Sequence, residues 1–257
     1  WIHRSVGTTE IYFVANRKDR SELVHCTFRV SGKQPEIWDC VTGKTRAASA
    51  FVQSGGRTSL PLELPPYGSL FVVFTGDIST SAHGASATNA PRTSPLLTVD
   101  GPWTVHFDPK WGGPESVTFS RLESWTARVE EGIRYYSGSA TYRATFRLDS
   151  VPKGGVLLDL GEVKAIAHLH VNGIDLGAAW TKPFRVDASR ALRAGENLLE
   201  VEVVNLWPNR LIGDGLKPAG ERLTSTNVAV YYQPTPEGHK LLDSGLLGPV
   251  RLLSTLA

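Results

Sequence analysis

The residues best suited to bind a polar ligand stand close together near position 210. Trp207, Asn209, Arg210 and Asp214 offer an aromatic ring, an amide, a guanidinium and a carboxylate in one short stretch. An indole can stack on the apolar face of a sugar ring, and the planar polar groups can hydrogen-bond its hydroxyls. A structural role is the alternative, with Trp207 closing a core and Arg210 paired with Asp214. The sequence leaves both interpretations open.

A strand is predicted to deliver this cluster. Residues 200–205 alternate polar and apolar side chains, which is the period of a half-buried strand, so Val201 and Val203 should face a core. Pro208 lacks a backbone N–H and should end the strand. Residues 209–214 are then expected to form a recognition loop, a common place for binding residues.

Further aromatic residues could line a sugar site. Trp111 lies in a loop rich in Gly and Pro, Tyr136 precedes a predicted strand, and Trp180 precedes Lys182 and Pro183. Each could instead pack in a core or against a loop. The predicted ligand-binding set is Trp111, Tyr136, Trp180, Trp207, Asn209, Arg210 and Asp214.

The sequence indicates catalytic and metal-binding residues less clearly than sugar-binding ones. Inverting glycosidases need two carboxyl groups roughly 6.5–9.5 Å apart, but no spacing selects a pair among Asp108, Glu115, Glu123, Glu130, Glu131 and Asp214, which fit solvated surface acids. His168 and His170 share a face of a predicted strand, yet no third ligand is evident, so no metal site is predicted. A structural calcium ion stays open as an alternative, although it would need several oxygen ligands and no Asp-rich loop is visible. No other cofactor is expected.

Composition limits the classes of function. The chain has 257 residues, enough for one large domain or two ordinary ones, and its formal net charge is +2 without a basic run, so nucleic acid is not expected. No apolar run approaches the roughly 18 residues that span a bilayer.

Cys26 and Cys40 are the only cysteines, and either a disulfide or two free thiols would fit. The chain lacks Met and starts at Trp1, so we expect the natural protein to continue upstream.

The strand pattern predicts two all-β modules. Short strands separated by turns indicate a small antiparallel β-sandwich over residues 1–76. Residues 77–95 are small and polar and are expected to form a linker. Strands resume over residues 96–257, where Asn172-Gly173 is a hairpin signal and no long amphipathic helix is found, so a jelly roll with long loops is predicted. The predicted strands are 11–15, 23–30, 36–39, 58–64, 69–75, 102–107, 116–119, 138–148, 155–160, 165–171, 174–177, 184–186, 198–205, 227–232 and 250–253.

Several strings resemble glycoside hydrolase family 106, the α-L-rhamnosidases. They cover nearly the whole chain except the expected linker, and they lie at residues 2–4, 11–17, 32–39, 107–114, 136–143, 160–163, 171–177, 205–214 and 244–250. The second module is also similar to the galactose-binding-like jelly roll of family 2 glycosidases, on the strings at 136–143 and 171–177. In such enzymes a loop of this domain can reach the active site, and residues 207–214 match that loop by pattern.

The resemblance implies a C-terminal accessory role. The family's catalytic carboxylates belong to a barrel that would precede Trp1, so no catalytic residue is carried over. The expected partners are a carbohydrate and an upstream catalytic domain, in a periplasmic or secreted protein that degrades bacterial polysaccharide substrates. Two alternatives stay open: a self-sufficient glycoside hydrolase with a carboxylate pair in jelly-roll loops, and a purely structural β-module.

Overall fold

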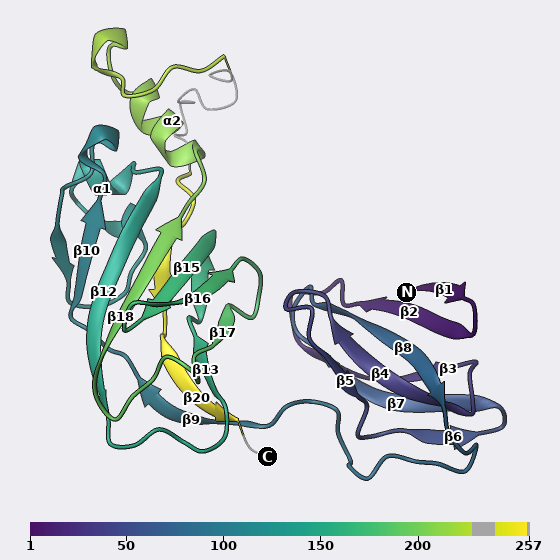
Figure 1. Cartoon of the computed structure of the whole chain (residues 1–257). Coiled ribbons are helices and arrows are strands. Elements are labelled where there is room, and N and C mark those ends of the chain that lie inside the picture. The colour runs from purple at the N-terminus through teal and green to yellow at the C-terminus, as the bar shows by residue number, and fades with distance from the viewer. Residues whose placement is uncertain (228–239, 256–257) are drawn as a thin grey trace. The chain divides into compact units, whose positions relative to one another are not determined.

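The protein is built almost entirely from β-strands. A computed structural model describes residues 1–227 and 240–255 (Figure 1). The chain divides into two compact units, residues 1–91 and 92–257. All strand ladders in the described residues are antiparallel, as the alternating patterns predicted, so the all-β sandwich fold class is confirmed. The finer likeness to a galactose-binding-like jelly roll stays a prediction.

The first unit is a sandwich of two sheets. One sheet has the order β1-β2-β8-β4-β5 and the other β3-β7-β6. Alternate residues of β7, such as Leu60 and Leu62, are buried against Val72 and Phe74 of β8, and this is the core between the sheets. The strands are β1 (Ile2–Val6), β2 (Thr9–Ala15), β3 (Glu22–Phe28), β4 (Lys33–Asp39), β5 (Thr45–Ala47), β6 (Val52–Ser54), β7 (Arg57–Leu64) and β8 (Ser69–Asp77).

The expected linker over residues 77–95 is largely part of the first unit. Asn89 is buried, and its amide binds the main chain of Ser49, Ala50 and Pro61 through four hydrogen bonds of 2.7–3.0 Å. Main-chain bonds also join Gly84 and Ser86 to the same region. The polar composition reflects side chains that bind backbone groups. The next strand, β9 (Thr93–Thr98), already belongs to the second unit.

The second unit contains two larger sheets and one short ladder. Their strand orders are β11-β10-β12-β18-β15-β16, β17-β13-β20-β9 and β14-β19. The strands are β10 (Trp103–Phe107), β11 (Val117–Phe119), β12 (Ser139–Leu148), β13 (Val156–Asp159), β14 (Glu162–Lys164), β15 (Ile166–Val171), β16 (Ile174–Ala179), β17 (Arg185–Asp187), β18 (Gly195–Val204), β19 (Gly245–Gly248) and β20 (Arg251–Thr255). The helical pieces are η1 (Pro109–Trp111), η2 (Trp125–Ala127), α1 (Glu131–Arg134), α2 (Pro208–Gly215) and η3 (Ala219–Glu221).

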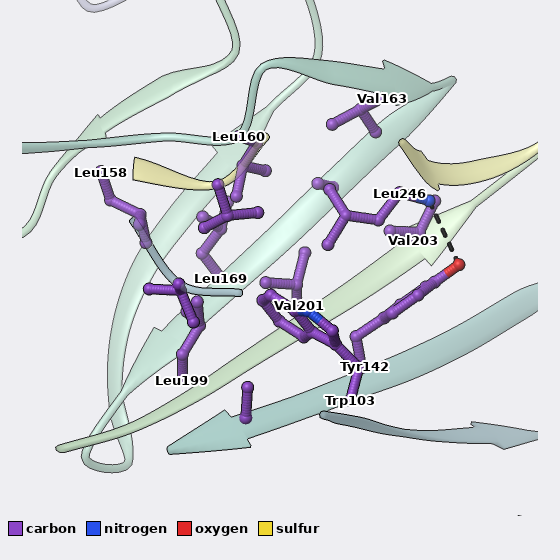
Figure 2. Close-up of a cluster of buried hydrophobic side chains, with 14 of the residues drawn as sticks. Trp103, Tyr142, Leu158, Leu160, Val163, Leu169, Leu199, Val201, Val203 and Leu246 are labelled. Carbon is purple, nitrogen blue, oxygen red and sulfur yellow. Dashed lines mark hydrogen bonds between the residues drawn. The ribbon is translucent and has the colours of Figure 1, made fainter. Parts of the chain in front are cut away.

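The core of the second unit lies between its two larger sheets. Val201 and Leu169 of the six-stranded sheet and Leu158 of the four-stranded sheet belong to one buried cluster (Figure 2). Tyr142 is fully buried in this cluster, and its hydroxyl accepts a hydrogen bond of 3.2 Å from the Leu246 main-chain N–H, drawn in Figure 2. A hydroxyl buried in an apolar core needs such partners, because an unpaired one would cost free energy.

The structure tests several local expectations. Val201 and Val203 are fully buried, as the alternation of residues 200–205 predicted. Cys26 and Cys40 are free thiols, so the disulfide alternative is wrong, and burial raises the pKa of Cys26. The strand predicted over residues 227–232 falls almost wholly outside the described residues.

Candidate functional site

The segment expected to be a recognition loop is the short helix α2. Trp207 occupies the N-cap position and Pro208 starts the helix, where its fixed φ fits and its missing N–H has no helical partner to lose. Asn209, Arg210, Ile212 and Asp214 are buried, while Trp207 is exposed before the first turn. The loop expectation failed because interactions with distant segments stabilise this helix.

Two buried asparagines fasten α2 to the rest of the unit. The Asn209 amide donates to Leu242 O at 2.7 Å and accepts from Leu242 N at 2.8 Å. Asn205, at the end of β18, donates to Tyr136 O and accepts from Gly138 N, at 2.8 and 2.9 Å. Both asparagines also donate to the buried hydroxyl of Ser244. Asn209, which we predicted as a ligand-binding residue, uses these groups within the fold.

The pairing of Arg210 with Asp214 favours the structural alternative. Arg210 Nη1 lies 3.6 Å from Asp214 Oδ1, and both side chains are buried. Desolvation lowers the pKa of Arg210, and the Asp214 carboxylate opposes that shift. The other Asp214 oxygen accepts from the Thr224 main chain and hydroxyl, at 2.8 and 2.5 Å. Arg210 Nη2 donates to Trp111 O at 3.1 Å and so holds the η1 turn beside α2.

This anchoring places two predicted aromatic residues together. The Trp111 and Trp207 rings meet edge to face, with centroids 5.8 Å apart and planes at 88°. Trp207 keeps 54% of its surface exposed, whereas Trp111 is half-buried. Edge-to-face contact fixes one ring against the other and leaves a ring face free. An exposed indole on a tightly anchored helix is the arrangement needed to stack on a flat apolar ligand surface.

Tyr136 and Trp180 do not join this aromatic pair. Tyr136 is fully buried, contacts Phe107 and Trp125, and donates its hydroxyl to Ser139 O at 2.8 Å, so its ring lies in the core. Burial raises the pKa of Tyr136. Trp180 follows β16 and is 57% exposed, and the described residues give it no ring partner.

A surface hollow lies at the start of α2. It has a volume of about 390 Å³ and is lined by Lys164, Ala165, Asn205, Leu206 and residues 240–244. Leu206 immediately precedes the exposed Trp207. Lys164 is bound to Glu162 at 2.5 Å, and this hydrogen bond is the main reason that the pKa of Glu162 is lowered. Asp243 and Lys240 are exposed in the hollow. The sequence reading missed these residues, because nothing near positions 164 and 240 marks a site.

The candidate acids hold structural partners or face solvent. Arg128 bridges Glu123 and Glu130 at 3.1 and 2.5 Å, and its hydrogen bond is the largest cause of the lowered pKa of Glu130. Asp108 caps η1 by accepting from Lys110 N, and Asp214 is buried. Glu115 and Glu131 are exposed. The described residues therefore offer these acids as caps, ion pairs and surface groups.

The pair His168 and His170 has a neighbour that the sequence reading missed. Asp175, from the next strand, brings a carboxylate to the two imidazoles, and the donor atoms of the three residues all lie within 4.8 Å of one another. The Asn172-Gly173 turn was recognised, but the local register that brings Asp175 to the histidines was not predictable from the turn alone.

The fold and this aromatic surface define a class of protein with two β-sandwich units. The second unit presents an exposed indole beside a polar hollow. Comparison with known proteins makes that class more specific. The model of the alpha-L-rhamnosidase family, glycoside hydrolase family 106, matches residues 1–52. A putative beta-glucuronidase of Formosa agariphila is 35% identical over 188 residues, which cover 65% of this chain and 16% of the relative.

A solved structure extends the similarity to nearly the whole chain. A rhamnosidase from Novosphingobium sp. PP1Y matches with a TM-score of 0.86 and 37% identity, over 98% of this chain and 23% of the rhamnosidase chain. The chain thus spans less than a quarter of the length of either relative. The chain is related to glycoside hydrolases, and the resemblance to α-L-rhamnosidases expected from the sequence is confirmed.

In residues 1–227 and 240–255, none of the helices has the length and apolar character needed to cross a bilayer.

Proposed function

We propose that this chain is a non-catalytic β-module of a rhamnosidase-type glycoside hydrolase and that it binds a sugar ring on Trp207. In this proposal the catalytic barrel belongs to the part of the relatives that the chain does not match. The supporting observation is the Trp207 indole, which is 54% exposed and rests edge to face on Trp111. Sugar rings stack on aromatic faces of this kind.

The surroundings of Trp207 favour binding over a loose surface contact. The buried hydrogen bonds of Asn209 and the Arg210 contact with Trp111 O hold both indoles before any ligand arrives. A ligand therefore orders few groups when it binds, which reduces the entropic cost. The adjoining hollow contains a carboxylate and ammonium groups, from Asp243, Lys164 and Lys240, that can hydrogen-bond sugar hydroxyls.

The test is a titration with L-rhamnose and methyl α-L-rhamnoside, followed by tryptophan fluorescence and calorimetry. We expect saturable binding by the wild-type chain and a loss of about fivefold or more in Trp207→Ala, because stacking on an aromatic ring contributes about 1–3 kcal/mol. Trp180→Ala is the matched control, since Trp180 is equally exposed at 57%. Equal losses in the two variants, or no saturable binding to any rhamnoside-containing glycan, would contradict the proposal.

Hydrolysis provides the second arm of the test. We expect no turnover of an aryl α-L-rhamnoside, or of a panel of other aryl glycosides, by the purified chain. Turnover above the blank would show that this chain carries its own catalytic groups and would refute the non-catalytic role. An Asp214→Ala variant is not a useful probe, because the buried carboxylate holds Thr224 and pairs with Arg210.

A supporting role for another domain is the second candidate. Leu206, next to Trp207, and Leu216, at the other end of α2, are 59% and 57% exposed, so both ends of the helix present apolar side chains. Such a surface could pack against a catalytic domain. This candidate is favoured if the chain binds no glycan and if Leu206→Ser lowers its affinity for a separately expressed catalytic domain of the Novosphingobium relative. It is refuted if that affinity is unchanged.

A further inference from the structure

We propose that His168, His170 and Asp175 form a binding site for a divalent transition-metal ion, most suitably zinc. The site lies on the hairpin of β15 and β16 and is independent of the sugar-binding proposal. It uses two imidazole nitrogens and one carboxylate oxygen, from residues that have no part in the Trp207 surface.

The backbone brings the three donors to one face. His168 and His170 are two positions apart on β15, so both side chains point away from the core, while Ala167, Leu169 and Val171 are buried between and around them. The centroids of the two imidazole rings lie 4.8 Å apart, and the ring planes meet at 70°. A bulge between Leu169 and His170 shifts the register, so His170 lies opposite Asp175. The resulting carboxylate position serves both histidines.

The donors are partly fixed before an ion binds. Asp175 Oδ1 lies 2.8 Å from His168 Nε2 and accepts a hydrogen bond of 2.7 Å from Gly177 N. The latter bond holds the Asp175 carboxylate against the backbone of its own strand and beside the His168 imidazole. β15 is an interior strand between β18 and β16, which keeps the two histidine backbones in place. His168 and Asp175 side chains are 40% and 59% exposed, so an ion can reach them.

The donor set selects the class of metal. Zinc binds imidazole nitrogen and carboxylate oxygen at about 2.0–2.2 Å. The present separations, up to 4.8 Å, need a small inward rotation of exposed side chains. The His168–Asp175 contact would be exchanged for shared coordination, at little cost because exposed ion pairs contribute little to stability. Calcium and magnesium prefer oxygen ligands, so a site with two imidazoles disfavours them.

The neighbouring charges are mixed, with an excess of carboxylates. Strand register places Glu202 opposite His168 and Glu200 opposite His170, on the same face of the sheet. Glu200 is bound to Arg143 at 2.8 Å. The Arg190 guanidinium donates to the main-chain oxygen of Asp175 and brings one positive charge near the site. Glu202 and the Asp175 carboxylate offset that charge and favour a cation.

The test measures zinc binding by the full chain without a histidine tag. Calorimetry with ZnCl₂ and the visible absorption of added Co²⁺ should report one saturable site per chain. His168→Ala, His170→Ala and Asp175→Asn should each weaken zinc by at least about tenfold, since even outer-shell partners of a metal typically account for 10–100-fold. Zinc should also raise the melting temperature of the wild-type chain through its preference for the folded state.

Two controls make the result decisive. His25→Ala removes an exposed histidine of the first unit and should leave zinc affinity unchanged. Circular dichroism without metal should show that the ligand variants fold, as expected for side chains on a solvent-facing surface. The proposal is overturned if the chain shows no saturable zinc binding, if the ligand variants bind as well as the wild type, or if Ca²⁺ competes at an affinity equal to that of zinc.

Discussion

Removing one oxygen atom from the core, in Tyr142→Phe, should destabilise the second unit by about 2–4 kcal/mol. The Tyr142 hydroxyl accepts hydrogen bonds from Trp125 Nε1 and from Leu246 N, and both lie in the buried core. Phe fits the same space, so apolar burial hardly changes. The variant instead leaves two buried donors without an acceptor, at about 1–3 kcal/mol each. Two such donors would together cost about 2–6 kcal/mol. The hydrogen bond from Leu246 N is long, at 3.2 Å, so the expected loss lies in the lower half of this range.

Tyr136→Phe is the matched control for this deletion. The Tyr136 hydroxyl accepts from Asp108 N at 3.1 Å and donates to Ser139 O at 2.8 Å. Asp108 and Ser139 are exposed, so water can take over these bonds in the variant. We therefore expect a loss below about 1 kcal/mol, within the range of a typical solvent-accessible hydrogen bond. The two variants remove the same atom and differ in access to water.

Urea unfolding followed by tryptophan emission separates these outcomes. Trp1 and Trp38 lie in the first unit and the other five tryptophans in the second, so the signal reports mainly the second unit. The free energy of unfolding is obtained from the midpoint and the slope. Equal losses in the two variants, or a loss below about 1 kcal/mol in Tyr142→Phe, would refute the claim that unsatisfied donors dominate the cost.

Two further predictions concern alkaline pH and one glycine. Burial raises the pKa of Tyr142 well above its usual range, so its stabilising contribution is intact below about pH 10, where the unfolded phenol ionises, and is lost as pH rises toward the folded pKa. Urea unfolding at several alkaline pH values should show this decline, and Tyr142→Phe should reduce its slope. Gly161→Ala should cost more than the roughly 1–2 kcal/mol of a left-handed residue, because its Cβ would lie 2.4 Å from the Gly248 main chain. Gly173→Ala, also at positive φ but with nothing within 4 Å, is the control in thermal unfolding, and equal losses would contradict the steric argument.

Most of the correctly predicted fold follows from the alternation of polar and apolar residues along the strands. Ala140, Tyr142, Ala144 and Phe146 alternate along β12 and are all buried, because period-two alternation depends only on which face meets the core. The polar stretch near Asn89 misled the linker prediction. Composition cannot distinguish side chains that bind water from those that bind distant backbone groups, and the Asn89 partners lie about forty residues earlier.

The candidate site was only partly predictable for the same reason. The sequence identified Trp207 and Trp111 but could not show that their rings meet, since Arg210 joins segments almost a hundred residues apart. For Tyr136 the sequence left a sugar-binding role and a core role open, because its burial depends on contacts with distant Phe107 and Trp125. Asp175 was missed because a β-bulge, which has no dependable sequence signal, sets its position.

The place of β20 has a consequence for how the protein is made. β20 (Arg251–Thr255) lies inside the four-stranded sheet, paired with β13 on one side and with β9, the first strand of the unit, on the other. While the ribosome is still adding residues, β9 and β13 lack their common partner, and the sandwich cannot close until residue 255 has emerged. Pairings over such long sequence separations form slowly and leave strand edges exposed meanwhile. The second unit should therefore complete its folding only after its last strand is available, and it is during that interval that chaperones would be most useful to it.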